Sequence, residues 1–203
     1  MAATFTFGED NGNAAGSPPK GTSRTDPVVN VNWKNIDDAT TAYGASPIAA
    51  GNNGYVKWQF GHFAAPFNAV LNGLWSHTAG TAGTGITLFG TVSPARVYTT
   101  PATTPADGLT DDQTATTAIA AGLQVAFGPT GPEAGGKGAG SATVPCYTPW
   151  LITQLRSAGT AAAGDTTPVT YTLRYDENGI IGTLIPWAIG ASALGHAALT
   201  SLC

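Results

Sequence analysis

Apolar and polar residues alternate with a period of two along much of this chain. Successive side chains of a β-strand point to opposite faces, so this period predicts strands. The cleanest run, residues 169–175, sets four apolar side chains against two threonines and one arginine. Further candidate strands cover residues 3–7, 29–33, 55–63, 67–75, 86–92, 123–127 and 150–156.

Turn-forming segments separate these runs. The chain contains 27 glycines and 14 prolines, which interrupt long helices. The only internal helix candidate is a short Ala-rich stretch after Asp111. About eight short strands with such spacers predict an all-β fold, an antiparallel β-sandwich of jelly-roll-like type.

Two segments are predicted to be arms on this domain, which we expect to span residues 1–178. Residues 8–26 are polar and rich in Gly, Pro and Ser, which indicates a flexible arm without a strand. Residues 179–203 carry no formal charge and form an apolar C-terminal arm. Their length would allow a membrane span, but Pro186, several glycines and an acidic flank argue against one.

An apolar arm of this kind is expected to be buried, against its own domain or in a groove on a neighbouring subunit, because a free apolar tail promotes aggregation. The side chains that we expect to make these contacts are Ile185, Trp187, Ile189, Leu194 and Leu199.

Charge is sparse. Charged residues make up 10% of the chain, against about 25% in typical soluble domains, and the net charge is −4. Few like charges oppose association, so the composition favours a protein that stands in an assembly. The basic residues are scattered singly, so no positive stripe predicts direct nucleic-acid binding.

The first ten residues lack a basic region and a continuous apolar run, so we expect no secretory signal and predict synthesis in a cytoplasm. Two free thiols are then expected at Cys146 and Cys203, with a disulfide between them as the alternative.

Motifs for catalysis are incomplete. Residues 131–137 match the start of a phosphate-binding loop, but Gly138 stands where a hydroxyl should follow. Ser192 lies in a partial nucleophile elbow in which Leu194 replaces the second glycine. The three histidines, His62, His77 and His196, lack metal-ligand spacing. We therefore expect no enzyme activity, no cofactor and no metal.

Acidic residues occur as neighbours, among them Asp37 and Asp38. Adjacent side chains on a strand point to opposite faces, so such doublets do not form a local acid/base pair and are expected to cap turns or bind water. A calcium ion at this pair is the alternative, without a ligand-spaced loop to support it. Trp58, Trp75 and Trp150 are expected in the core, with the floor of a sugar site as the alternative.

Several segments resemble virion proteins of tailed bacteriophages. They are residues 32–38 (Asn-Trp-Lys-Asn-Ile-Asp-Asp), 50–55 leading into Trp58, 63–67 followed by Asn72, and the strand 171–177. The resemblance spans most of residues 28–178 and points to small β-rich capsid decoration or cement proteins, or to tail and fibre modules.

This resemblance implies a virion structural protein that contacts copies of itself and other virion proteins, such as a major capsid protein, as a homo-oligomer. We predict a capsid decoration or cement protein, located in the virion and without membrane or nucleic-acid contact. The alternative is a tail, fibre or surface module that binds carbohydrate.

Overall fold

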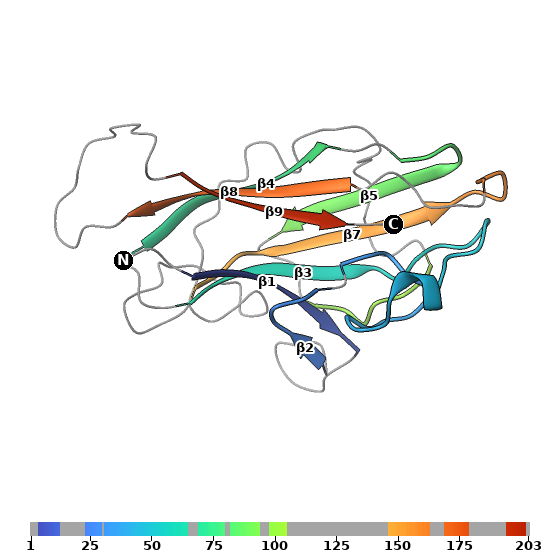
Figure 1. Cartoon of the computed structure of the whole chain (residues 1–203), viewed down its shortest axis with the longest axis horizontal. Coiled ribbons are helices and arrows are strands. Elements are labelled where there is room, and N and C mark those ends of the chain that lie inside the picture. Colours follow the sequence, from blue (N-terminus) through green and yellow to red (C-terminus); the bar gives the residue numbers. More distant parts are fainter. Residues whose placement is uncertain are drawn as a thin grey trace.

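The chain folds into antiparallel strands in the computed structural model (Figure 1). The structure describes residues 4–12, 23–29, 31–64, 69–79, 82–93, 98–104, 146–162, 169–178 and 194–201. Within these ranges the only helical element is a single 3₁₀ turn, η1 (Tyr43–Ala45). No helix there is long and apolar enough to cross a membrane.

The larger sheet, sheet A, has the strand order β2-β1-β3-β7-β5. Its strands are β2 (Ser23–Thr25), β1 (Thr4–Asn11), β3 (Lys57–Ala64), β7 (Trp150–Ser157) and β5 (Ile86–Ser93). A two-residue strand, β6 (Cys146–Tyr147), also pairs with β3.

The strands β6 and β7 pair with different stretches of β3 and are separated by Thr148 and Pro149. Proline has no backbone N–H, so it cannot donate to the ladder. The Thr148 hydroxyl accepts a hydrogen bond from the backbone N–H of Gly61 at 2.8 Å. The Thr148 side chain therefore provides a hydrogen-bond acceptor for a backbone N–H of β3 at the point where regular strand pairing stops.

Sheet B contains three antiparallel strands in the order β4-β8-β9. They are β4 (Ala69–Ala79), β8 (Val169–Asn178) and β9 (Leu194–Ser201). Residues 194–201 of the predicted C-terminal arm thus form a strand on β8, while residues 179–193 lie outside the described part.

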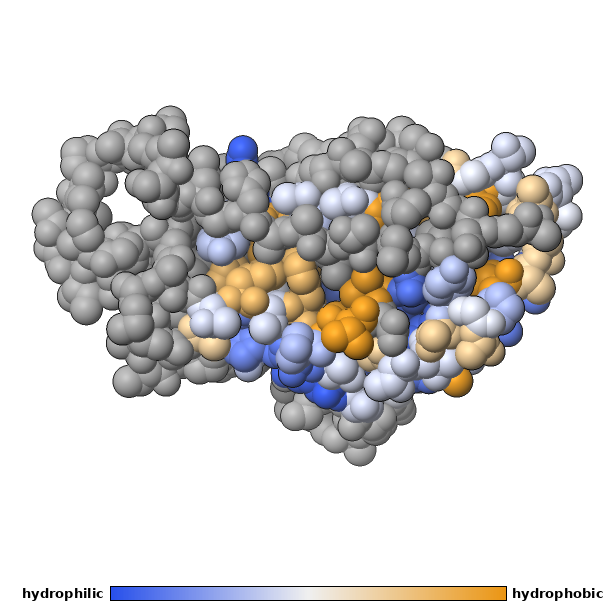
Figure 2. All heavy atoms as spheres, viewed as in Figure 1, coloured by the Kyte–Doolittle hydropathy of each residue, from blue (hydrophilic) through white to orange (hydrophobic). Residues whose placement is uncertain are grey.

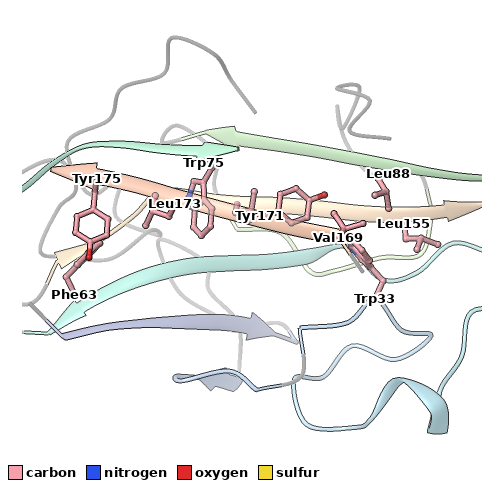
Figure 3. Packing of buried hydrophobic residues seen from close by; sticks show 10 residues of the cluster. Trp33, Phe63, Trp75, Leu88, Leu155, Val169, Tyr171, Leu173 and Tyr175 are labelled. Atoms are coloured by element: carbon pink, nitrogen blue, oxygen red, sulfur yellow. The ribbon is translucent and has the colours of Figure 1, made fainter. Parts of the chain in front are cut away.

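One apolar cluster joins the two sheets. Tyr171 and Leu173 of β8 pack together with Phe63 of β3 and Leu155 of β7. Figure 3 shows these side chains in a row, from Tyr175 and Phe63 at one end to Trp33 at the other. We call the side of sheet A that faces this cluster its inner face.

A second cluster covers the outer face of sheet A. Its buried members are Val56, Trp58, Phe60, Tyr98, Trp150 and Ile152. Phe60 lies on Gly8 of β1, where an added Cβ would come within 2.2 Å of the ring. Sheet A is therefore buried on both faces, although alternation alone predicts one face toward solvent or a neighbour.

The prediction of an all-β, antiparallel protein is confirmed. Six of the eight predicted runs match β1, β3, β4, β5, β7 and β8. The run 123–127 and the helix candidate after Asp111 lie outside the described residues. The prediction of a strand over 29–33 is wrong, because Val31 and Trp33 lie in a loop and Trp33 packs into the inner cluster without a partner strand.

The prediction of a flexible arm over 8–26 is wrong at both ends. Residues 8–11 belong to β1, and residues 23–25 form β2, which pairs with β1. The polar residues Glu9, Asp10 and Asn11 are buried in the strand because each has polar partners, described below.

Replacing Gly8 with alanine is expected to destabilise the fold by about 1–3 kcal/mol, because the Phe60 ring is fully buried and cannot yield to an added methyl group. Urea unfolding followed by fluorescence measures this loss. Gly44→Ala is the matched control, since no atom lies within 4 Å of its added Cβ, and a change within about 0.5 kcal/mol is expected there. Equal effects of the two substitutions would contradict this packing.

Candidate functional site

Polar residues with almost no exposure meet on the inner face of sheet A, between β1 and β3. Glu9 is 0% exposed and Lys57 is 2% exposed. Lys57 Nζ donates to Glu9 Oε1 at 2.8 Å, and Gln59 Nε2 donates to Glu9 Oε2 at 3.0 Å. Both carboxylate oxygens are thus satisfied, which a buried charge requires. We call Glu9, Asn11, Lys57 and Gln59 the Glu9 cluster.

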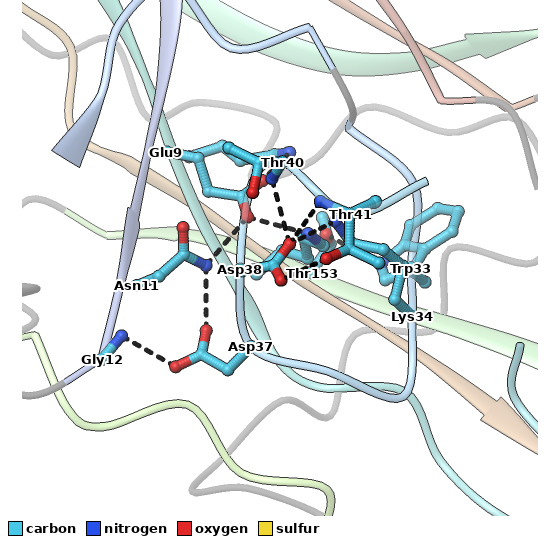
Figure 4. Close-up of polar contacts among 12 residues, drawn as sticks. Glu9, Asn11, Gly12, Trp33, Lys34, Asp37, Asp38, Thr40, Thr41 and Thr153 are labelled. Carbon is cyan, nitrogen blue, oxygen red and sulfur yellow. Dashed lines mark hydrogen bonds and ion pairs between the residues drawn. The ribbon is translucent and has the colours of Figure 1, made fainter. Parts of the chain in front are cut away.

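Asn11 connects this cluster to the loop of residues 31–41. Its Nδ2 donates to Glu9 Oε1 at 3.0 Å and to Asp37 Oδ1 at 2.9 Å (Figure 4). The backbone N–H of Gly12 donates to Asp37 Oδ2 at 2.7 Å. The end of β1 is therefore tied to the loop through one carboxylate.

The same loop is closed by a second ion pair. Lys34 Nζ, fully buried, donates to Asp38 Oδ1 at 3.1 Å and to the backbone oxygen of Thr41 at 2.7 Å. Asp38 also accepts from the backbone N–H groups of Thr40 and Thr41 and from the Thr41 hydroxyl. Asp38 therefore caps a turn, as predicted for these acidic neighbours.

These contacts shift two pKa values. Burial alone would raise the pKa of Asp38, but the hydrogen bonds from Thr41, Lys34 and Thr40 outweigh it and hold that pKa well below its usual range. Burial, together with the positive charge of Lys57, lowers the pKa of Lys34 despite the neighbouring carboxylates.

Trp33 covers the inner face of sheet A beside the cluster. Its indole Nε1 donates to Thr153 Oγ1 of β7 at 3.2 Å, and Thr153 is the register partner of Lys57. The bulky ring, itself buried, excludes water from this end of the sheet.

Arg24 and Asp10 form an ion pair on the outer face of sheet A. Arg24 of β2 donates to both oxygens of Asp10, each at 2.7 Å, and its guanidinium carbon lies 4.7 Å from the centroid of the Phe60 ring. Bidentate geometry and the aromatic face both suit a planar guanidinium. This contact fixes the short strand β2 on β1.

His62 lies at the same outer face. Its Nδ1 is within hydrogen-bond distance of Asp26, which also accepts from the Thr6 hydroxyl at 2.6 Å, and its ring stacks on Tyr147 at 4.6 Å. Burial would raise the pKa of Asp26, but the His62 and Thr6 contacts outweigh it and lower that pKa. His62 is therefore a hydrogen-bonded histidine at the edge of a packed face.

Trp58, Trp75 and Trp150 are buried members of the two apolar clusters. The prediction that they belong to the core is confirmed. A sugar platform needs an aromatic face open to solvent, so these three side chains do not provide one.

Large apolar side chains are strongly exposed at two described positions, both in loop segments. Val29 is 80% exposed and Ile36 is 38% exposed. Ile36 belongs to the 31–41 loop, which the Lys34–Asp38 pair and Asp37 hold in place. The loop thus presents an apolar side chain from a fixed backbone, which suits a contact surface.

The predicted interaction residues are only partly placed. Leu194 and Leu199 lie in β9, opposite Asp176 and Tyr171 of β8. Ile185, Trp187 and Ile189 lie outside the described residues, as do residues 131–138, Ser192 and Cys203. Within the described ranges, no three His, Cys, Asp or Glu side chains converge as metal ligands would.

Sequence reasoning missed the Glu9 cluster, although the signal was present. Residues 9 and 11 continue the alternation of Phe5 and Phe7, which places them on the inner face. Residues 57 and 59 alternate with Trp58, which places them together on the opposite face of β3. The missing step was to pair the two polar faces across neighbouring strands.

Comparison with known proteins adds no identification: no family model, curated protein or solved structure matches this chain.

Asp38→Asn is expected to cost about 1–2 kcal/mol near pH 6, because a neutral amide accepts the Lys34 and Thr41 hydrogen bonds less strongly. The folded-state pKa of Asp38 is depressed, so its contribution is fully present above its ordinary pKa of about 4 and is lost as pH falls below that value. Urea unfolding at pH 6 and at about pH 2.5 measures both. The difference between wild type and variant should shrink at acid pH; a constant difference would contradict the assignment.

Proposed function

We propose that this chain is a structural subunit of a virus particle, a capsid decoration or cement protein that works by contact with neighbouring subunits. The proposal includes a fold of sandwich type with jelly-roll-like connections, supported by the apolar cluster common to sheets A and B. The resemblance to tailed-bacteriophage virion proteins, which spans most of residues 28–178, supports a location in the virus particle.

The observation that carries the proposal is the burial of four charged side chains in a chain that has few charges. Two of the four lysines, Lys34 and Lys57, are buried, and so are the carboxylates of Glu9 and Asp10. A chain that is only 10% charged therefore keeps still fewer charges for its exterior. Such a surface has little electrostatic repulsion to prevent subunit packing.

The described residues on the face drawn in Figure 2 agree with this distribution. Among the coloured atoms, strongly hydrophilic surface occurs as small patches between pale and apolar areas. Mixed surfaces of this kind are ordinary in protein–protein interfaces, whose mean polarity differs little from that of other surface. Contacts of modest strength become strong when they repeat on a lattice, because each bound subunit raises the effective concentration of the next contact.

The edges of sheet B offer a second mode of contact. In the described part of the chain, β4 and β9 each pair with β8 alone. An edge strand with unpaired backbone groups accepts an added strand from a neighbour. This would bring Leu194 and Leu199 of β9 close to a subunit interface, the role predicted for them.

The assembly state of the purified chain tests the proposal. Native mass spectrometry and electron microscopy, alone and with candidate capsid particles, should detect a symmetric oligomer or particle-bound protein. A strictly monomeric protein without affinity for any particle would count against it.

Val29→Asp and Ile36→Asp are expected to weaken that association at least tenfold, because each places a charge at an exposed apolar position. Analytical ultracentrifugation or particle co-sedimentation measures the change. Ala50→Asp, at an exposed loop position, is the matched control and should leave association unchanged. Equal behaviour of all three variants would exclude Val29 and Ile36 from the interface.

A further inference from the structure

Lys57 and Asn11 face each other across β1 and β3. Asp10 pairs with Trp58 in the antiparallel register, so the next position sets Asn11 opposite Lys57. Directly opposed residues have Cβ atoms about 5 Å apart, within reach of a lysine side chain. Lys57 Nζ and Asn11 Nδ2 contact the same oxygen, Glu9 Oε1, at 2.8 and 3.0 Å.

We propose that Lys57 and Asn11 form an intramolecular isopeptide bond, with Glu9 as the group that moves the protons. The inference rests on this geometry alone and is independent of the proposed function. An amine nucleophile, a carboxamide and a carboxyl group that touches both are the parts that such an acyl transfer requires.

The surroundings favour the reaction. Asn11 is 5% exposed, and Trp33 covers the same face of sheet A. Attack requires the neutral amine, and the contact of Lys57 Nζ with Glu9 Oε1 at 2.8 Å gives its proton a direct path to the carboxylate. A desolvated neutral amine is a competent nucleophile. Exclusion of water also protects the acyl group from hydrolysis.

The step balances without a co-reactant. Lys57 Nζ attacks Asn11 Cγ, and Glu9, which contacts both nitrogens, delivers its own proton to Nδ2 and accepts one from Nζ. The carbonyl re-forms from the oxyanion as the Cγ–Nδ2 bond breaks. Ammonia leaves, a secondary amide joins Nζ to Cγ, and one proton remains on Glu9.

Asp37 acts as a positioning residue. Its Oδ1 accepts from Asn11 Nδ2 at 2.9 Å, so the carboxamide is held between two carboxylates with its leaving nitrogen directed toward Glu9 (Figure 4). The other buried lysine lacks such a partner: Lys34 Nζ contacts the Asp38 carboxylate and a backbone oxygen. An ionised carboxylate is a poor electrophile, which makes Lys34 the natural control.

Mass spectrometry of the folded, purified chain tests the bond. The protein should be about 17 Da lighter than its sequence predicts, the mass of one ammonia. Trypsin should fail to cleave after Lys57, and the digest should contain residues 1–20 joined to residues 35–96 as one branched peptide.

Three variants locate the groups that react, and a fourth, Lys34→Arg, is the control. Lys57→Arg keeps the positive charge and Asn11→Ala removes the carboxamide, so both should have the unmodified mass. Glu9→Gln should slow bond formation at least tenfold after refolding, with circular dichroism to verify the fold. Lys34→Arg should retain the loss of ammonia.

A folded wild-type chain with unmodified mass and normal cleavage after Lys57 would overturn the proposal, whatever the variants do. Loss of ammonia that persists in Lys57→Arg would overturn it equally, since another pair would then be joined. If Glu9→Gln formed the isopeptide bond completely and at the wild-type rate, a role of Glu9 in proton transfer would be excluded.

Discussion

The fold depends on a carboxylate held away from water. Glu9 has no exposure, and its partners come from the neighbouring strand β3 and from its own strand β1. A buried charge without partners would be strongly destabilising, so this contact fixes the alignment of β1. A slip of one residue would turn Glu9 to the outer face and bring Asp10 inside, away from Arg24.

The adjacent acids Glu9 and Asp10 let β1 hold partners on both faces of sheet A. Glu9 faces Lys57 on the inner side, and Asp10 faces Arg24 on the outer side. The inner pair lies beside the cluster that joins the sheets, and the outer pair lies over the aromatic ring of Phe60. One short strand thus anchors the loop of residues 31–41 on one face and β2 on the other.

The strands were predictable because their apolar residues alternate, as in residues 169–175. The polar end of β1 was not predictable in this way, because Glu9, Asp10 and Asn11 have the composition of a loop. Burial of such residues depends on partners 14 to 50 positions away in the chain, which no local window contains. The strand predicted over residues 29–33 was wrong for the opposite reason. Trp33 is apolar and buried, as in a strand, but no strand pairs with its backbone.

The position of the lysines has a practical consequence for chemical labelling. Lys34 and Lys57 are two of the four lysines, and both amines point into the protein. Reagents that acylate amines, such as activated-ester dyes and cross-linkers, would be kept from both of these amines in the folded chain. Labelling at Lys34 would therefore report local opening of the fold.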